Sequence, residues 1–100
     1  MTAGLVDPIG LKLTGAQHEA CINALAGAFP TYAALREMVR YRLDFDLARI
    51  APERSSMDEV VVRLIRDRLS KGGFLQLIAS AQAERPGNEP LAAFAASVGL

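Results

Sequence analysis

Apolar residues recur at helical spacing through most of the chain, and turn-forming residues interrupt the pattern. From Thr14 onward the apolar positions follow a period of three to four residues, which is typical of one buried face of an α-helix. The period stops at Pro30, Pro52 and Gly73 and resumes after each, because proline and glycine end helices. The pattern predicts six helices, over residues 15–28, 32–42, 44–51 (short), between 56 and 72, 74–85, and a last one after 88 of undefined length.

Capping signatures support these boundaries. Thr14 is followed three residues later by Gln17, and Ser56 by Glu59, which are the spacings of a capping box at a helix start. Thr31 and Asn88 are single N-cap candidates, and the pair at 72–73 is a glycine C-cap and turn.

The sequence contains no pattern typical of a β-strand. A half-buried strand needs apolar and polar residues in alternation, and the run Val60–Val62 instead falls inside a capped helical pattern. The connections are only a few residues long, which favours antiparallel neighbours. We therefore predict an all-α protein, a compact antiparallel six-helix bundle, with an irregular leader over 1–13 and a single domain over 14–98.

Composition narrows the class of protein. The chain has 100 residues, of which 51% are hydrophobic and 22% charged, so it is expected to fold as one domain. Eleven basic and eleven acidic residues give a net charge of zero, which disfavours strong nucleic-acid binding. The single cysteine, Cys21, has no disulfide partner, and neither a signal peptide nor a membrane span is visible. We expect a cytoplasmic location.

The residues available for catalysis are few. His18 and Cys21 lie three apart on one helix face, and a thiolate–imidazole pair is the sharpest enzymatic interpretation. The alternative, which we favour, places Cys21 in the core and His18 at its edge, because free cysteine is among the most buried residues. Together with Glu19, His18 and Cys21 would supply too few ligands for a structural zinc site, which needs four. We expect no enzyme activity, no cofactor and no metal.

Two further motifs have structural interpretations. The glycines at 72–73 lack the Lys-Ser/Thr pair of a phosphate-binding loop. Asp44 and Asp46 lack the glycine and the distal glutamate of a calcium loop, and we expect them to cap the short third helix.

The charged residues form the most informative pattern. Basic pairs one turn apart mark the second and fourth predicted helices, and acidic residues mark helix starts and connections. These complementary surfaces favour self-association of the chain into a homo-oligomer. The alternative is that these are solvated faces with ordinary pairs such as Glu59–Arg63. The aliphatic part of the Arg68 side chain is expected to pack on the core, and its guanidinium group is expected to form an ion pair. The candidate interface residues are Arg36, Arg40, Arg63, Arg66, Asp44, Asp46, Asp58 and Glu59.

Several segments together resemble a known family. The most specific is the junction Pro86-Gly87-Asn88-Glu89-Pro90-Leu91, followed by Phe94 and preceded by Gly73, Leu75 and Ile78. The others are Leu13-Thr14, Phe29-Pro30, Leu35, Met38-Val39, Leu47 and Ile50. Over residues 13–94 the sequence resembles the bacterial effector-associated domain, first type.

The resemblance implies a six-helix death-like fold used as an adaptor by homotypic pairing. One copy of such a domain is carried by an effector, such as a protease, a caspase-like protein or a TIR protein, and another by a sensor or NTPase. The resemblance carries over no functional residues, so the interface candidates rest on the charge pattern alone.

An alternative function is a helix-turn-helix-like nucleic-acid-binding domain that uses Arg63, Arg66 and Arg68 of the fourth helix as its recognition surface. The zero net charge, the acidic residues at the start of that helix and the lack of a basic arm weaken this alternative.

Overall fold

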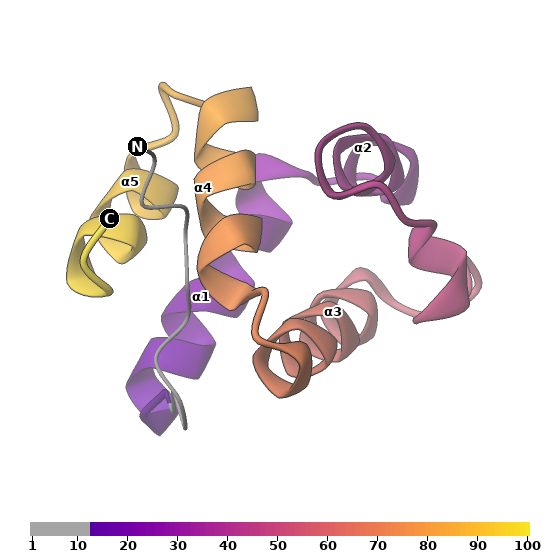
Figure 1. Cartoon of the computed structure of the whole chain (residues 1–100), viewed down its shortest axis with the longest axis horizontal. Helices are drawn as coiled ribbons and strands as arrows, with labels where there is room; N and C mark the ends of the chain where they lie inside the picture. The colour runs from indigo at the N-terminus through magenta and orange to yellow at the C-terminus, as the bar shows by residue number, and fades with distance from the viewer. Residues whose placement is uncertain (1–12) are drawn as a thin grey trace.

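All regular structure in the described part of the chain, residues 13–100 of a computed structural model, is helical (Figure 1). No strand occurs among these residues, which confirms the predicted all-α class. The elements are α1 (Gly15–Ala28), α2 (Tyr32–Met38), the π-helical turn η1 (Val39–Leu43), the 3₁₀ turn η2 (Leu47–Arg49), α3 (Met57–Lys71), α4 (Phe74–Glu84) and α5 (Glu89–Ser97).

The predicted caps define most of the helix starts. The Thr14 hydroxyl accepts a hydrogen bond from the Gln17 amide at 3.1 Å, and the Thr14 amide donates to the Gln17 side chain at 2.9 Å, so the capping box is complete. At α3, Ser56 accepts from the Glu59 amide at 3.2 Å, but the Glu59 carboxylate turns to Arg63. The second predicted capping box is therefore only half formed.

The prediction of six helices is wrong by one. The predicted short helix over 44–51 is only the single 3₁₀ turn η2, because Asp44 adopts a left-handed backbone (φ 62°) and Asp46 an extended one. Only the five residues 47–51 then remain before Pro52, which is too few for the two helical turns that the pattern predicts. The predicted helix over 32–42 likewise divides into α2 and η1, so the bundle has five α-helices within residues 13–100.

One apolar core joins these elements. Helix α4 runs through the middle of the bundle and packs against α5, α3 and η1, while α1 packs against α5 and α3 (Figure 1). The rings of Phe74 and Phe94 meet edge to face, with centroids 6.1 Å apart. Among the described residues no charged side chain is buried, and the ionisable groups of the core are the thiol of Cys21 and the phenol of Tyr32.

Two contacts fix the irregular segment between η1 and α3 against the bundle. The Tyr32 hydroxyl donates a buried hydrogen bond of 2.8 Å to the Ala51 carbonyl, and Leu47 is fully buried. At the start of the domain, Leu13 packs against the core. The rest of the predicted leader, including Leu11, lies outside the described residues.

Candidate interaction surface

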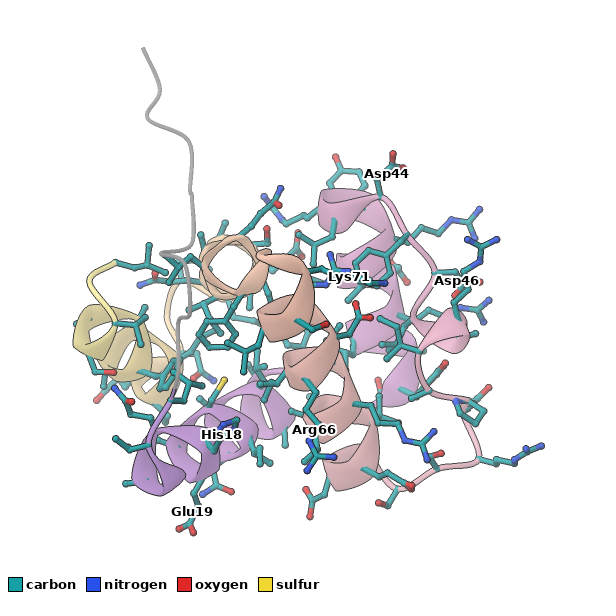
Figure 2. All side chains as sticks on the ribbon, turned by 60° about the horizontal axis from the view of Figure 1, so that its bottom comes forward. His18, Glu19, Asp44, Asp46, Arg66 and Lys71 are labelled. Atoms are coloured by element: carbon teal, nitrogen blue, oxygen red, sulfur yellow. The ribbon has the colours of Figure 1, made fainter. Side chains whose placement is uncertain are left out.

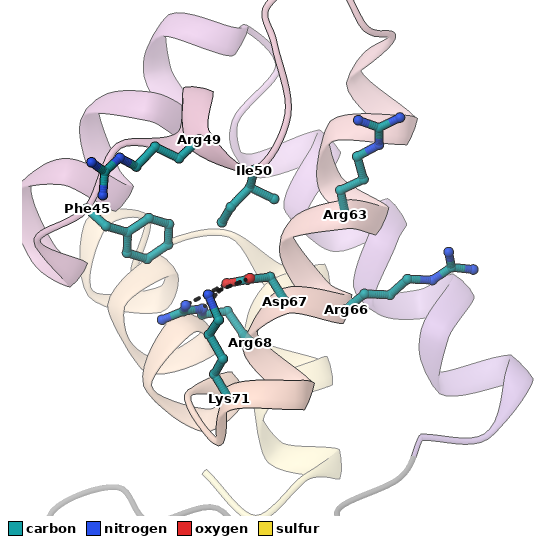
Figure 3. A pocket seen from close by; sticks show the side chains of 8 residues that line it. All are labelled: Phe45, Arg49, Ile50, Arg63, Arg66, Asp67, Arg68 and Lys71. Atoms are coloured by element: carbon teal, nitrogen blue, oxygen red, sulfur yellow. Dashed lines mark hydrogen bonds and ion pairs between the residues drawn. The ribbon is translucent and has the colours of Figure 1, made fainter.

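The stretch from Phe45 to Ile50, which includes η2, and the outer face of α3 line a concave surface of about 620 Å³ (Figure 3). We call this surface the basic groove. Five of its side chains are cationic and one is a carboxylate, a formal charge of +4 in a chain of zero net charge. Its lining residues are Phe45, Arg49, Ile50, Arg63, Arg66, Asp67, Arg68 and Lys71.

The floor of the basic groove combines apolar and paired charged groups. Phe45 and Ile50 are partly buried against the core, and the Arg68 guanidinium lies 4.4 Å from the centroid of the Phe45 ring. Arg68 also donates to Asp67 at 3.0 and 2.5 Å, and the Lys71 ammonium lies 3.1 Å from the same carboxylate. The predicted packing of the Arg68 stem and pairing of its tip are therefore confirmed.

Electrostatics keep Asp67 ionised in this setting. Partial burial by itself raises its pKa, but the hydrogen bonds from Arg68 and Lys71 outweigh burial and lower the pKa below its ordinary value. Asp67 thus neutralises part of the local charge and orders two of the five cations.

The outer cations of the groove differ in their partners. Arg63 contacts Glu59 at 3.2 Å, one helical turn away, as the sequence suggested. Arg49 and Arg66 form no ion pair among residues 13–100, and both are exposed. Their guanidinium groups are therefore available to an external partner.

The predicted basic and acidic candidates on the second helix and its following loop lie together. Arg36 donates to both oxygens of Asp46, at 3.0 and 3.1 Å, and Asp46 also accepts from the Ala48 amide at 3.0 Å. The Arg36 hydrogen bonds and then the Ala48 amide lower the pKa of Asp46, and the carboxylate in turn raises the pKa of Arg36. Asp46 caps η2, as expected, but the expectation that Asp44 also caps it is wrong, because Asp44 ends η1 in a left-handed backbone.

The remaining candidates lie in three places. Arg40 and Asp44 border a shallow hollow beside the groove, together with Phe45, Asp46 and Arg49. Asp58 and Glu59 occupy the first turn of α3, where they complement the positive end of the helix dipole. Only Arg63 and Arg66 of the eight candidates line the basic groove itself.

The structure gives no support to a reactive His18–Cys21 pair. Cys21 is completely buried, and this burial raises the pKa of its thiol to about 12. No hydrogen bond joins the two side chains within residues 13–100, although they share α1. A nucleophilic thiol requires the opposite pKa shift.

Sequence reasoning missed several residues with structural roles. Arg49 and Lys71 complete the basic groove, and Arg42 binds Glu84 at 2.7 Å, which ties η1 to α4. Arg85 donates to the Ala28 carbonyl at 3.1 Å while its guanidinium lies 4.7 Å from the Phe29 ring. No local pattern signals the place of Arg49 or the contacts of Arg42 and Arg85, because each joins distant parts of the chain. Lys71 instead lies one turn after Asp67 on α3.

Within residues 13–100, no three His, Cys, Asp or Glu side chains gather in a way that could hold a metal ion. None of the helices in this part of the chain combines the length and apolar character that a transmembrane span needs.

Comparison with known proteins gives one match. The sequence model of a family described as effector-associated domain 1 matches residues 11–99. No curated protein and no solved structure matches the chain. The matched range covers every helix described above, including both sides of the basic groove.

Proposed function

This chain belongs to the effector-associated domain 1 family, and on that premise we propose that it is a non-catalytic adaptor module of a bacterial defence or signalling system. In this proposal the module recruits an effector, of protease, caspase-like or TIR type, by pairing with another copy of the fold. The partner copy is carried by a second protein, either the effector itself or a sensor or NTPase.

The observation that carries the proposal is the basic groove. It concentrates a formal charge of +4 on one face of a neutral chain, and it includes two exposed arginines, Arg49 and Arg66, that form no ion pair among residues 13–100. Exposed charges of one sign steer a complementary surface toward a defined orientation. Such a patch is typical of a recognition surface rather than of a solvated helix face.

The chemistry of the polar groups supports a binding role. The buried thiol of Cys21 has a pKa of about 12, which disfavours a nucleophile, and the concave basic surface contains a single acidic side chain, already paired with two cations. General acid–base catalysis needs a group that is free to exchange a proton near neutral pH. We find no such group in the groove.

The nucleic-acid alternative has less support. Arg68, one of its three proposed recognition arginines, points toward Phe45 and is paired with Asp67. Asp58 and Glu59 place negative charge on the first turn of α3, where a phosphate would otherwise bind.

Light scattering on mixtures tests the proposal. The chain is mixed with each related domain encoded in the same genome, and the molar mass is measured at low and at high salt. We expect a defined complex with at least one such domain, which weakens as salt screens the charges. Free components in every mixture at low salt would contradict the proposed function.

A further inference from the structure

We propose that the basic groove forms one side of an asymmetric contact, in which it binds an acidic face of a different polypeptide and not a second copy of this chain. The inference rests on the proposed function and specifies the chemistry of the partner. It predicts that the isolated chain is monomeric although it is an association module.

The groove needs an acidic counterpart because its charge is only partly compensated within the chain. Asp67 is its one carboxylate, and it already contacts both Arg68 and Lys71. Arg49 and Arg66 are exposed and form no ion pair within the described chain. A partner that brings carboxylates to these two guanidinium groups gains charge-assisted hydrogen bonds.

Residues 13–100 of this chain present no such counterpart. Four of the acidic residues in the described part are used in internal ion pairs, with Arg36, Arg42, Arg63 and Arg68 as their partners. The remaining ones are distributed one to a segment, on α1, α2, the bend after η1, the turn before α3, the start of α3 and the start of α5. Figure 2 shows this dispersion, with Glu19 far from Asp44 and Asp46.

The shape of the groove favours a protein surface over a small anion. Figure 3 shows Arg63 and Arg66 reaching outward from α3, while Arg49 lies on the other side of Phe45 and Ile50. The guanidinium groups therefore do not converge on one point, as they would around a phosphate. In a protein–protein interface the centre is apolar and the rim is polar. The partly apolar floor of the groove matches such a centre, and its separated charges match the rim.

The symmetry of assembly follows from this arrangement. A groove on one chain and an acidic face on another form a heterologous contact. When neither chain carries both surfaces, the two chains form one pair and the assembly does not grow further. An identical copy would bring a second +4 groove and scattered acids, so like charges would oppose pairing.

The decisive variants are Arg49→Glu and Arg66→Glu, with Arg54→Glu as the matched control. Arg54 is exposed in the turn before α3 and lies outside the groove, so its reversal changes the net charge equally. Circular dichroism and thermal unfolding check that every variant folds. Affinity is measured by calorimetry against the related domain that forms a complex in the light-scattering experiment above.

We expect each groove variant to weaken binding by about tenfold or more, and the control to change it by less than about twofold. Equal affinities for the groove variants and the control would overturn the inference, although the complex itself would still support the proposed function. No complex with any related domain would overturn the proposed function and, with it, the inference.

Two further measurements test whether the groove instead binds a second copy of this chain or a small anion. The chain alone is followed by light scattering from about 10 μM to about 1 mM, where we expect a monomer throughout. A dimer that Arg66→Glu abolishes and Arg54→Glu preserves would overturn the inference in favour of self-pairing. Inorganic tripolyphosphate is added to the complex, and displacement of the partner at micromolar concentration would overturn it in favour of a small-anion site.

Discussion

The Arg36 guanidinium binds the Asp46 carboxylate through two parallel hydrogen bonds of 3.0 and 3.1 Å. The two residues are ten apart in sequence, and their pairing closes the chain around η1 and positions the segment that borders the basic groove. Two candidates for opposite intermolecular surfaces thus bind each other within one molecule. This ion pair, which we call the brace, holds the segment beside the groove in place.

Alanine variants of this brace should differ in severity. Arg36→Ala removes the ion pair alone, whereas Asp46→Ala also removes the cap on the Ala48 amide at the start of η2. We expect Asp46→Ala to lower the free energy of unfolding more than Arg36→Ala, with the double variant less destabilised than the sum. Urea unfolding of the three variants measures this. Strictly additive losses would contradict a direct contact.

Acid should destabilise the domain through Asp46 and Asp67. Both have a folded-state pKa below the ordinary value of 3.8, so the unfolded chain takes up more protons as the pH falls. The stabilisation from these carboxylates is complete above about pH 5 and is lost as the pH drops through and below 4. Thermal unfolding between about pH 3 and 7 measures the profile. In the double variant Asp46→Asn, Asp67→Asn, the unfolding temperature should fall less steeply as the pH is lowered. An unchanged dependence of the unfolding temperature on pH would contradict the assignment.

The thiol of Cys21 should be inert in the native protein. It is fully buried on α1, and its pKa is raised from 9.0 to about 12. Reaction with Ellman's reagent at pH 8 is therefore expected to be at least about a hundredfold slower than in denaturant, since it requires opening of the fold. Reaction as fast as in the unfolded chain would show that the core around Cys21 is open.

The same thiol contributes to the loss of stability in alkali. Because its folded-state pKa is the higher one, the unfolded chain loses its proton first, and stability falls as the pH rises from about 9 toward 12. Replacement Cys21→Ala should remove this part of the alkaline loss, at the cost of a small cavity. Unfolding in urea at pH 8 and pH 10 compares the two chains.

Arg85 should stabilise the junction of α1 and α4. Its guanidinium donates to the Ala28 carbonyl at the end of α1 and stacks on the Phe29 ring. We expect Arg85→Ala to lower the free energy of unfolding by about 1–2 kcal/mol. The matched surface change Arg54→Ala should cost less than about 0.5 kcal/mol. Equal effects of the two substitutions in urea unfolding would contradict this role.

The helix ends were the most predictable part of the fold. Thr14, Thr31 and Asn88 each bind an amide only three residues away, so the sequence pattern and the structure carry the same information. The left-handed Gly72 at the end of α3 is equally local. The exception is η2, where the left-handed backbone of Asp44, at a non-glycine residue, shortened the helix that the apolar spacing predicted.

The candidate surface was only partly predictable. Arg63 and Arg66 are one turn apart on α3, and this spacing alone placed them on one outward face. Arg49 joins them only because the segment after η1 folds back against α3, and that contact depends on the buried Leu47 and on the hydrogen bond from Tyr32 to Ala51. Helical spacing cannot reveal a surface that two separate segments build together.

The most direct test of the central claim is to map the contact on the chain itself. The ¹⁵N-labelled chain is titrated with the related domain that binds it, and amide shifts are followed by NMR. The account predicts that the largest shifts fall in residues 45–50 and 63–71, on the two sides of the basic groove. Largest shifts on the α1–α5 face, with these residues unchanged, would contradict it.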